Sequence, residues 1–543
     1  MSKIAHYLQE HLTGEVSTSP EVRRYFAHDG SILRLAPAVV VYPRNENDVR
    51  KTASFSWQLA ERGRVLPLTA RGGGSDTSGA ALGAGIMLVF PAHMNKILEL
   101  NPKKEYIIAE PGATYDKVEQ TLYTHGLFLP PYPASQQYAT LGGGLANNAI
   151  GEKSVKYGST GDYAEKLRVV LANGEVIETG LLSKRELNKK LGLSSFEGEI
   201  YRAIDALIEE NAELVRQQAA LSDVRHNSVG YNLPAVKTKR GFDLTPLFVG
   251  SQGTLGIITE ATFRVVPHNP LTKLILMSFE RLEDFQTVLP KILDLKPSIC
   301  DMVNKAAINQ VLSINPRQLD NILPAPNAEM HLFIEFDDQK PSDQKKAIKN
   351  LSKIADKAGA YVMIADEPDD QDKIHKVRES VSTILNEPSG QTKAVPVAED
   401  VAVPVDHLVD FLNQAAAIYE AAGMRPAVWG QAGEGVVRMH PMFDLSQIGD
   451  RQRIFKLADS LYAAALKLGG TLSAANGEGR VRAPYMVYMY GEELQKLMRQ
   501  VKKIFDPYGI LNPGVKTANR DEVKAMIRGD YNQAHRHEHL PRS

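Results

Sequence analysis

The chain has 543 residues, which is too long for one ordinary hydrophobic core and predicts two or three domains. Lys and Arg total 63 against 64 for Asp and Glu, so no overall field would recruit nucleic acid or an anionic membrane surface. The only cysteine, Cys300, excludes an intrachain disulfide, a cysteine-ligated iron–sulfur cluster and a structural cysteine–zinc site. The first residues lack the apolar region of a signal peptide, and no apolar stretch is long enough to span a bilayer. We therefore expect a cytoplasmic protein without a transmembrane segment.

Strand and helix signals alternate along the first half of the chain. A β-branched run at 39–42 ends at a proline, an amphipathic helix is predicted over 46–62, and a strand-like run at 65–68 leads into three consecutive glycines. Two apolar runs within 167–177 flank an Asn-Gly pair, which predicts a hairpin. The charged segment 183–235 favours helices and reads as an insertion. This order is typical of a mixed helix and strand domain.

Strand character returns in the second half after Pro267. We predict strands at 273–277, 330–336 and 360–364, with helices between them. The pattern indicates a second α/β region.

Three loops rich in glycine and short polar side chains carry the strongest functional signal. The first spans 71–79, the second spans 133–148 and continues through 156–162, and the third spans 250–259. Successive backbone N–H groups without Cβ atoms nearby can cradle a phosphate. Alone, the first loop is explained equally well as a glycine-rich surface turn. It is not the GxGxxG dinucleotide motif and has no acidic residue at the expected distance, which disfavours a nicotinamide site.

Taken together and in this order, the three loops resemble the FAD-binding domain of the vanillyl-alcohol-oxidase, or p-cresol methylhydroxylase (PCMH), type over residues 36–267. The resemblance implies a two-subdomain domain that binds FAD. Many relatives attach FAD covalently through a histidine in the first loop or a cysteine in the second. Neither residue is present there, so the resemblance implies noncovalent FAD. The positions implied are Arg71, Gly72, Gly73, Gly74 and Ser75 at the pyrophosphate, Thr140, Gly142, Gly143 and Asn148 along the flavin and its phosphates, Ile257 and Ile258 near the adenine and ribose, and Pro133, Ser135 and Gly256 elsewhere on the cofactor.

The C-terminal half resembles the FAD-linked D-2-hydroxy-acid dehydrogenases, which include D-lactate and D-2-hydroxyglutarate dehydrogenases and the glycolate oxidase FAD subunit. The segments that carry this resemblance are 399–404, 479–485 and 505–516. It implies an α+β protein in which an α/β, ferredoxin-like substrate or cap domain joins the FAD-binding domain. The predicted division is a helical lead-in (1–35), the FAD-binding domain (36–267, with the helical insertion 183–235), the substrate domain (268–499), a segment that returns to the FAD-binding domain (500–521) and a polar tail (522–543).

Three residues match the positions that hold the substrate carboxylate in this family. Arg378 stands in an Arg-Glu pair, Lys393 follows fifteen residues later, and Ser382 takes the small hydroxyl position between them. A guanidinium and an ammonium suit a carboxylate. The alternative is a solvated helix face, because Arg378 lies among other charged residues.

The family's metal and proton-transfer site departs from its pattern in this chain. Gln431 and Arg438 replace the two metal-binding histidines, Ala475 replaces the glutamate ligand, and Asn476 replaces the histidine base. We therefore expect no bound metal. Arg438 is a candidate for the positive charge that the metal supplies elsewhere, and His440 for a displaced base, with a structural histidine as the alternative.

Two functions remain open from the sequence. The first is a metal-independent flavin oxidoreductase that oxidises a D-2-hydroxy acid such as D-lactate, or a related carboxylate, by hydride transfer to the flavin. The second is an FAD-binding protein that has lost this activity and acts as a non-redox flavin transferase or binding partner. The superfamily includes the transferase alkylglycerone-phosphate synthase, and Arg438, Arg480 and Arg482 suit a phosphate-bearing ligand. The electron acceptor stays open among oxygen, a quinone, a cytochrome and a separate iron–sulfur protein, and a homodimer is compatible with the sequence.

Overall fold

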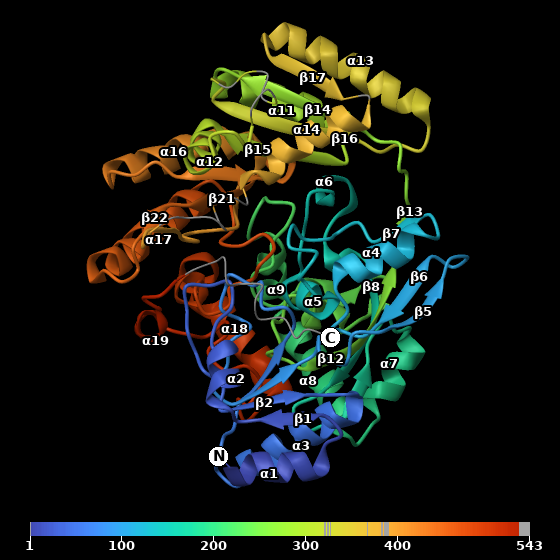
Figure 1. Ribbon diagram of the computed structural model, residues 1–543. Coiled ribbons are helices and arrows are strands. Elements are labelled where there is room, and N and C mark those ends of the chain that lie inside the picture. Colours follow the sequence, from blue (N-terminus) through green and yellow to red (C-terminus); the bar gives the residue numbers. More distant parts are fainter. Residues whose placement is uncertain are drawn as a thin grey trace.

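The computed structural model describes residues 2–319, 322, 325, 327–365, 367–381, 384 and 390–531. Figure 1 shows two bodies stacked on each other, an N-terminal domain coloured blue to green and a C-terminal domain coloured yellow to orange. The last helices, in red, return beside the N-terminal domain. Helices and strands occur in both bodies, so the predicted α+β class and two-domain architecture are confirmed.

The first subdomain is a four-stranded sheet packed against helices. Its parallel central strands are apolar and buried, as expected for strands covered on both faces. The predicted strand at 65–68 is displaced, because Val65 is exposed and ladder pairing starts only after Pro67. In order across the sheet the strands are β1 (Glu15–Ser17), β2 (Val39–Tyr42), β4 (Ile86–Val89) and β3 (Leu68–Arg71), and the helices are α1 (Ser2–His11), α2 (Pro20–Tyr25) and α3 (Glu46–Glu61).

The second subdomain is an antiparallel five-stranded sheet. Its central strand alternates buried and partly exposed residues, as one solvated face requires. The predicted hairpin is present, with Gly174 at φ +89° in its turn. Across the sheet the strands are β5 (Ile97–Asn101), β6 (Tyr106–Ala109), β12 (Ile257–Arg264), β8 (Ala164–Val170) and β9 (Val176–Glu178). The helices are α4 (Tyr115–Tyr123), α5 (Leu141–Asn147), α6 (Ser154–Tyr157), α10 (Thr245–Phe248) and, within the predicted insertion, α7 (Lys184–Leu191), α8 (Phe196–Glu210) and α9 (Ala212–Ala219). Short pairs form from β7 (Leu127–Phe128) with β13 (Val266–Pro267) and from β10 (Lys237–Thr238) with β11 (Gly241–Phe242).

The C-terminal domain is an antiparallel seven-stranded sheet covered by helices. Its strand at 330–336 is buried along its whole length, which matches the apolar run in the sequence. Across the sheet the strands are β17 (Tyr361–Ala365), β14 (Lys273–Phe279), β16 (Met330–Phe336), β15 (Ile299–Asn304), β20 (Ala427–Gly430), β21 (Val436–His440) and β19 (Val401–Ala402). The helices are α11 (Leu282–Leu293), α12 (Lys305–Ile314), α13 (Pro341–Ala358), α14 (Pro368–Glu379), α16 (Leu408–Ala421) and α17 (Ile448–Lys467), and β18 (Lys393–Ala394) pairs with β22 (Met442–Phe443).

The end of the chain packs back onto the N-terminal domain. Helix α18 (Met486–Phe505) already contacts α8, and the following segment joins the first sheet through Leu68, whose N–H bonds to the Ile510 carbonyl at 2.7 Å. Helix α19 (Arg520–Met526) begins near the start of the predicted polar tail, and Val523 and Tyr531 are buried. Residues 532–543 of that tail lie outside the described residues.

A buried carboxyl group beneath the second sheet predicts a pH-dependent stability. Glu119 on α4 is 4% exposed and accepts a 3.1 Å hydrogen bond from the Leu129 N–H. Burial raises the pKa of Glu119 from 4.5 to about 7, although the Leu129 hydrogen bond opposes the shift. The folded state holds this proton more tightly than the unfolded state. The contribution of Glu119 to the free energy of unfolding therefore falls as pH rises from about 4.5 to about 7.

We expect Glu119→Gln to be more stable than the wild type at pH 8 by about 1–3 kcal/mol, with a much smaller difference at pH 5. Urea unfolding at the two pH values measures this, with the exposed Glu165→Gln as the control. Equal differences for Glu119→Gln at both pH values would contradict the argument.

Candidate cofactor and substrate site

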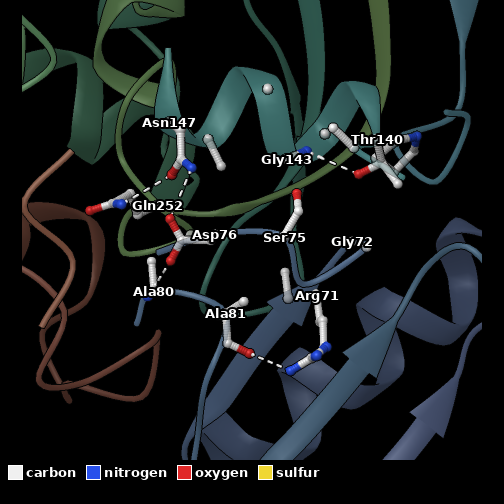
Figure 2. A pocket seen from close by; sticks show the side chains of 18 of the residues that line it. Arg71, Gly72, Ser75, Asp76, Ala80, Ala81, Thr140, Gly143, Asn147 and Gln252 are labelled. Carbon is white, nitrogen blue, oxygen red and sulfur yellow. Dashed lines mark hydrogen bonds between the residues drawn. The ribbon is translucent and has the colours of Figure 1, made fainter. Parts of the chain in front are cut away.

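An open cavity, about 1050 Å³ with the solvent at its mouth included, lies where the three glycine-rich loops meet (Figure 2). Of the predicted cofactor positions, those that line it are Arg71, Gly72, Gly73, Gly74, Ser75, Pro133, Ser135, Thr140, Gly142, Gly143, Gly256 and Ile258. Alanines, Asp76, Phe90, Pro111, Gly144, Asn147, Ser251, Gln252, Gly253 and Asn476 complete the lining. The cavity therefore joins segments far apart in the sequence, including one from the C-terminal domain.

The glycines are needed because the walls of the cavity approach each other too closely for side chains. A Cβ atom on Gly72 would lie 2.2 Å from the Thr140 Oγ1, and one on Gly144 would lie 1.9 Å from the Tyr115 hydroxyl oxygen. Thr140 caps α5, since its Oγ1 accepts a 3.2 Å hydrogen bond from the Gly143 N–H. A lining of glycines presents backbone atoms, and backbone N–H groups suit a diphosphate. The cavity therefore fits a large dinucleotide such as FAD.

Arg71 lies at the base of the first loop, and its guanidinium is bound to backbone carbonyls. Its Nη2 donates to the His28 carbonyl at 2.7 Å, and its Nη1 lies 3.4 Å from the Phe26 and Ala81 carbonyls. The side chain also underlies Gly74, where an added Cβ would lie 2.3 Å from Nη2. The side chain of Arg71 thus braces the loop, while the residue itself lines the cavity.

Two of the predicted cofactor residues are not among those that line the cavity. Asn148 ends α5 at φ +53°, and its Oδ1 accepts a 2.9 Å hydrogen bond from the Gly161 N–H. Ile257 is 2% exposed and packs into the core of the first subdomain. Both residues lie behind the cavity lining. For Ile257 the reason is the alternation along β12, which turns Ile258 toward the cavity and Ile257 away from it.

Asn476 is the cavity residue that the C-terminal domain contributes. Its backbone N–H donates a 2.8 Å hydrogen bond to the Asp400 Oδ2, which also accepts from the Ala475 N–H at 2.8 Å and from the Ser473 hydroxyl at 2.6 Å. Asp400 is fully buried and has φ +68°. Its Oδ1 lies 3.3 Å from the Arg438 Nη2. Asp400 therefore connects the cavity wall to Arg438.

Arg438 and His440 form a charged cluster behind this wall. Each lies 3.3 Å from the Glu399 Oε1, and the His440 ring packs on Trp429 at 4.8 Å between centroids. Burial raises the pKa of Glu399, but the charges of His440, Arg438 and Arg482 outweigh burial, so its pKa lies well below the usual value. His440 is 1% exposed. Neither Arg438 nor His440 is among the residues that line the cavity, so both lie outside the lining to which Asn476 belongs.

The predicted substrate anchors lie in the C-terminal domain. The Arg378 Nε lies 3.0 Å from the Asp301 Oδ2, and its Nη2 forms a short ion pair with Glu152 of the FAD-binding domain. Burial raises the pKa of Asp301 to about 7, against the charge of Arg378. Lys393 lies in β18, which pairs with β22, the strand that follows His440 in the chain. Ser382 lies outside the described residues. Arg378 therefore already pairs with two protein carboxylates.

Ion pairs join the C-terminal domain to the FAD-binding domain. Lys153 forms a short pair with Glu335 and lies 3.5 Å from the Asp337 Oδ2, and the Lys156 Nζ lies 2.6 Å from the Asp337 Oδ1. The Tyr157 hydroxyl donates to the Asp337 Oδ2 at 2.8 Å. A buried pair with one partner removed is strongly destabilising, so these contacts fix the domains relative to each other.

Arg480 and Arg482 are buried and bound to backbone carbonyls. The Arg480 Nη1 and Nη2 each donate at 2.7 Å, to the Gly79 and Pro513 carbonyls. The Arg482 Nη1 and Nη2 each donate at 2.9 Å, to the Gly477 and Glu399 carbonyls. Both side chains therefore serve loop packing, which leaves the phosphate role considered for them without support.

The described residues contain no group of three or more His, Cys, Asp and Glu side chains arranged to hold a metal ion. None of the helices within the described ranges is long and apolar enough to cross a membrane.

Comparison with known proteins agrees with this architecture. The family described as "FAD binding domain" matches residues 37–180, and the family described as "FAD linked oxidases, C-terminal domain" matches residues 269–515. The chain is 30% identical to D-2-hydroxyglutarate dehydrogenase of Escherichia coli (strain K12), over 93% of this chain and 50% of that protein. It is 27% identical to D-lactate dehydrogenase of Archaeoglobus fulgidus, over 88% of this chain and 90% of that protein. The chain thus spans about half the length of the first relative.

The fold is shared with p-cresol methylhydroxylase, whose structure superposes with a TM-score of 0.68 at 15% identity over 96% of this chain and 97% of that one. Fold and cavity together define the architecture of a two-domain FAD-binding protein. Its two parts match the FAD-binding domain and the C-terminal domain of FAD-linked oxidases.

Proposed function

We propose that this protein is an FAD-dependent oxidoreductase that oxidises a D-2-hydroxy acid such as D-lactate, or a related carboxylate. The cavity carries the proposal, because three glycine-rich loops and Asn476 of the C-terminal domain line one space. The names of the relatives support the substrate class, since they include D-2-hydroxyglutarate and D-lactate dehydrogenases. When bound, the flavin would accept the hydride that the substrate carbon loses.

The chain's own residues have distinct roles in this proposal. Asn476 faces the cavity and offers a hydrogen-bonding carboxamide where relatives have a base. Arg438 behind it supplies positive charge in place of a metal, and His440, in its neutral form, is the proposed base. Arg378 and Lys393 would bind the substrate carboxylate, and for Arg378 the substrate would replace Glu152 or Asp301. Electrons would leave to a quinone, oxygen or a separate iron–sulfur protein.

We also propose that FAD is held noncovalently, in a cytoplasmic protein. The residues that line the cavity include no histidine, cysteine or tyrosine to which a flavin could be linked. Denaturing the purified protein with acid should therefore release all of the FAD into the supernatant. Yellow colour that stays with the precipitated protein would contradict noncovalent binding. The single cysteine suits a reducing compartment.

Anaerobic mixing with substrate tests the reaction itself. We expect the visible absorbance of the flavin to bleach with D-lactate, D-2-hydroxyglutarate or another D-2-hydroxy acid, with no change in rate after treatment with a metal chelator. An oxidised spectrum after a broad panel of such acids would reject the proposal. A rate abolished by the chelator and restored by a divalent metal would reject its metal-independent form.

The anchors predict a separate effect on substrate binding. Lys393→Ala should weaken the apparent affinity for the carboxylate about tenfold or more and leave FAD bound, because a charge-assisted contact contributes about 1.5–3 kcal/mol. Arg378→Ala should do the same and also lower stability, because Glu152 and Asp301 lose their shared cation. Substrate titration of the flavin absorbance and thermal melting measure the two effects. Flavin loss in Lys393→Ala would show that the residue serves the cofactor instead.

A further inference from the structure

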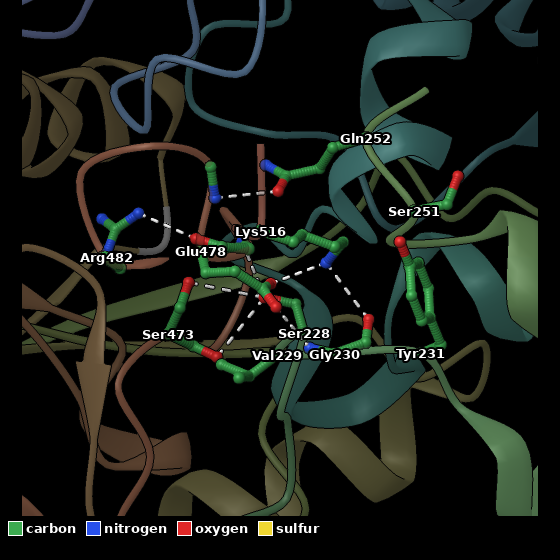
Figure 3. A network of polar contacts seen from close by, with 12 residues as sticks. Ser228, Val229, Gly230, Tyr231, Ser251, Gln252, Ser473, Glu478, Arg482 and Lys516 are labelled. Atoms are coloured by element: carbon green, nitrogen blue, oxygen red, sulfur yellow. Dashed lines mark hydrogen bonds and ion pairs between the residues drawn. The ribbon is translucent and has the colours of Figure 1, made fainter. Parts of the chain in front are cut away.

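Gln252 lies where the cavity-lining loops meet the C-terminal domain, and its carboxamide contacts three segments of the chain. Its Nε2 lies 3.1 Å from the Ser78 Oγ in the first loop and 3.0 Å from the Asn147 Oδ1 in the second. It also donates at 2.9 Å to the backbone carbonyl of Asn476. Its Oε1 accepts a 2.9 Å hydrogen bond from the Gly479 N–H. Figures 2 and 3 both show this side chain.

The backbone of Gln252 is equally constrained. Its N–H donates to the Ala146 carbonyl at 2.9 Å, and its carbonyl accepts from the Asn512 Nδ2 at 2.8 Å. The residue is 3% exposed and has φ +55°, a conformation that few non-glycine residues adopt. Such a conformation persists only where surrounding contacts determine it. Gln252 is thus held rigidly by the FAD-binding domain and can hold another segment in turn.

Only a carboxamide satisfies the partners around this side chain. Two of them have fixed roles, since the Asn476 carbonyl can only accept and the Gly479 N–H can only donate. A carboxamide has two N–H donors, which serve the Asn476 carbonyl and one of the two remaining acceptors, the Asn147 Oδ1 or the Ser78 Oγ. Its one acceptor oxygen serves the Gly479 N–H, so the orientation of the amide is fixed. A carboxylate would place an acceptor against the Asn476 carbonyl and the Asn147 Oδ1. An apolar side chain would leave the Gly479 N–H buried without its acceptor.

The segment 473–479 is anchored at its other points as well. Asp400 holds its beginning through the N–H groups of Ala475 and Asn476. At its end, the Glu478 Oε2 pairs with the Lys516 Nζ at 2.6 Å, and the Glu478 Oε1 accepts a 2.9 Å hydrogen bond from the Gly230 N–H (Figure 3). Between these anchors, Gln252 bonds to the segment from the cavity side.

We propose that Gln252 is a positioning residue, which holds Asn476 of the C-terminal domain in place against the cofactor cavity. This inference rests on the proposed function for its catalytic consequence. Gln252 would align the substrate-facing wall with the bound flavin, because its side chain bonds both to the cofactor-lining loops and to that wall. Removing the alignment should slow the reaction of bound substrate more than it weakens substrate binding, because Arg378 and Lys393 lie elsewhere.

Two substitutions in the FAD-bound protein test this, Gln252→Glu and the nearly isosteric, apolar Gln252→Met. The matched controls are Gln344→Glu and Gln344→Met. Gln344 is also buried, at 4% exposure, and its Nε2 donates to the Leu271 and Asp338 carbonyls at 2.8 and 2.9 Å, but it lies on α13 away from the cavity. The measurements are FAD per chain, amide hydrogen exchange over 473–479, and the rate of anaerobic flavin reduction at saturating D-2-hydroxy acid together with the apparent substrate affinity.

We expect both Gln252 variants to retain FAD within about twofold, to exchange the amides of 476–479 on the order of tenfold faster, and to reduce the flavin on the order of tenfold more slowly at saturation. The Gln344 variants should match the wild type in exchange and reduction. Wild-type exchange over 476–479 in both Gln252 variants would overturn the proposal, as would a weakened substrate affinity with an unchanged saturating rate. The exchange comparison needs no substrate, so it decides the placement of Asn476 even if no hydroxy acid reduces the wild-type flavin.

Discussion

Gly142→Ala is expected to yield a protein that purifies largely without FAD. Gly142 lies in the first turn of α5 and lines the cavity. A Cβ atom there would lie 2.6 Å from the Pro111 Cβ and 3.0 Å from the Pro111 carbonyl oxygen. Pro111 also lines the cavity and accepts the Gly142 N–H hydrogen bond at 2.9 Å. Because the proline ring and the backbone cannot rotate away, α5 must move relative to the wall that it faces.

Alanine normally favours a helix over glycine by about 0.8–1 kcal/mol, so helix propensity alone predicts the opposite result. Overpacking of this kind costs about 1–3 kcal/mol and displaces backbone that the cofactor would contact. We expect FAD affinity to fall about ten- to hundredfold, measured by titrating the apoprotein with FAD. Gly449→Ala is the control, since nothing lies within 4 Å of an added Cβ in the first turn of α17. Unchanged FAD affinity in Gly142→Ala would mean that α5 does not approach the cofactor.

The fold and the position of the cofactor cavity were predictable because their signals are local. A glycine run between a strand and a helix constrains the backbone by its lack of Cβ atoms, and β-branched runs identify buried strands wherever they occur. Local signals do not decide which residue of the pair 257–258 faces the cavity. The sequence places both Ile257 and Ile258 near the cofactor, but which of the two side chains faces the cavity depends on strand pairing with β8.

The roles of individual polar side chains were less predictable, because each depends on contacts between distant segments. Arg71 ends a strand and precedes glycines, yet its guanidinium binds the carbonyls of Phe26 and His28, more than forty residues earlier. Gln252 lies inside a recognisable loop, but nothing in that loop indicates a bond to the carbonyl of Asn476, 224 residues later. Arg378 matches a carboxylate anchor, and its pairing with Glu152 arises only when two domains pack together. Long-range partners of this kind leave no pattern in a single sequence.

The charged cluster behind Asn476 leads to the second large expected effect, in Asp400→Asn. This substitution keeps the shape of the side chain, and asparagine tolerates the φ of +68° as aspartate does. One carboxylate oxygen accepts three hydrogen bonds, and the other pairs with Arg438 at 3.3 Å. An amide must turn its NH₂ toward either the three donors or the guanidinium. Breaking a buried pair in this way costs about 3–5 kcal/mol.

We expect Asp400→Asn to unfold at lower urea concentration and to lose substrate-dependent flavin reduction by tenfold or more per bound FAD, because Asn476 loses the acceptor of its backbone N–H. Asp48→Asn separates the two effects. Asp48 is also fully buried and accepts hydrogen bonds from the N–H groups of Thr13, Gly14 and Arg44, but it lies in the first subdomain and does not line the cavity. That variant should lose stability and keep the wild-type rate of reduction per FAD. If Asp400→Asn also kept that rate, Asp400 would serve folding alone, and the position of Asn476 would not limit the reaction.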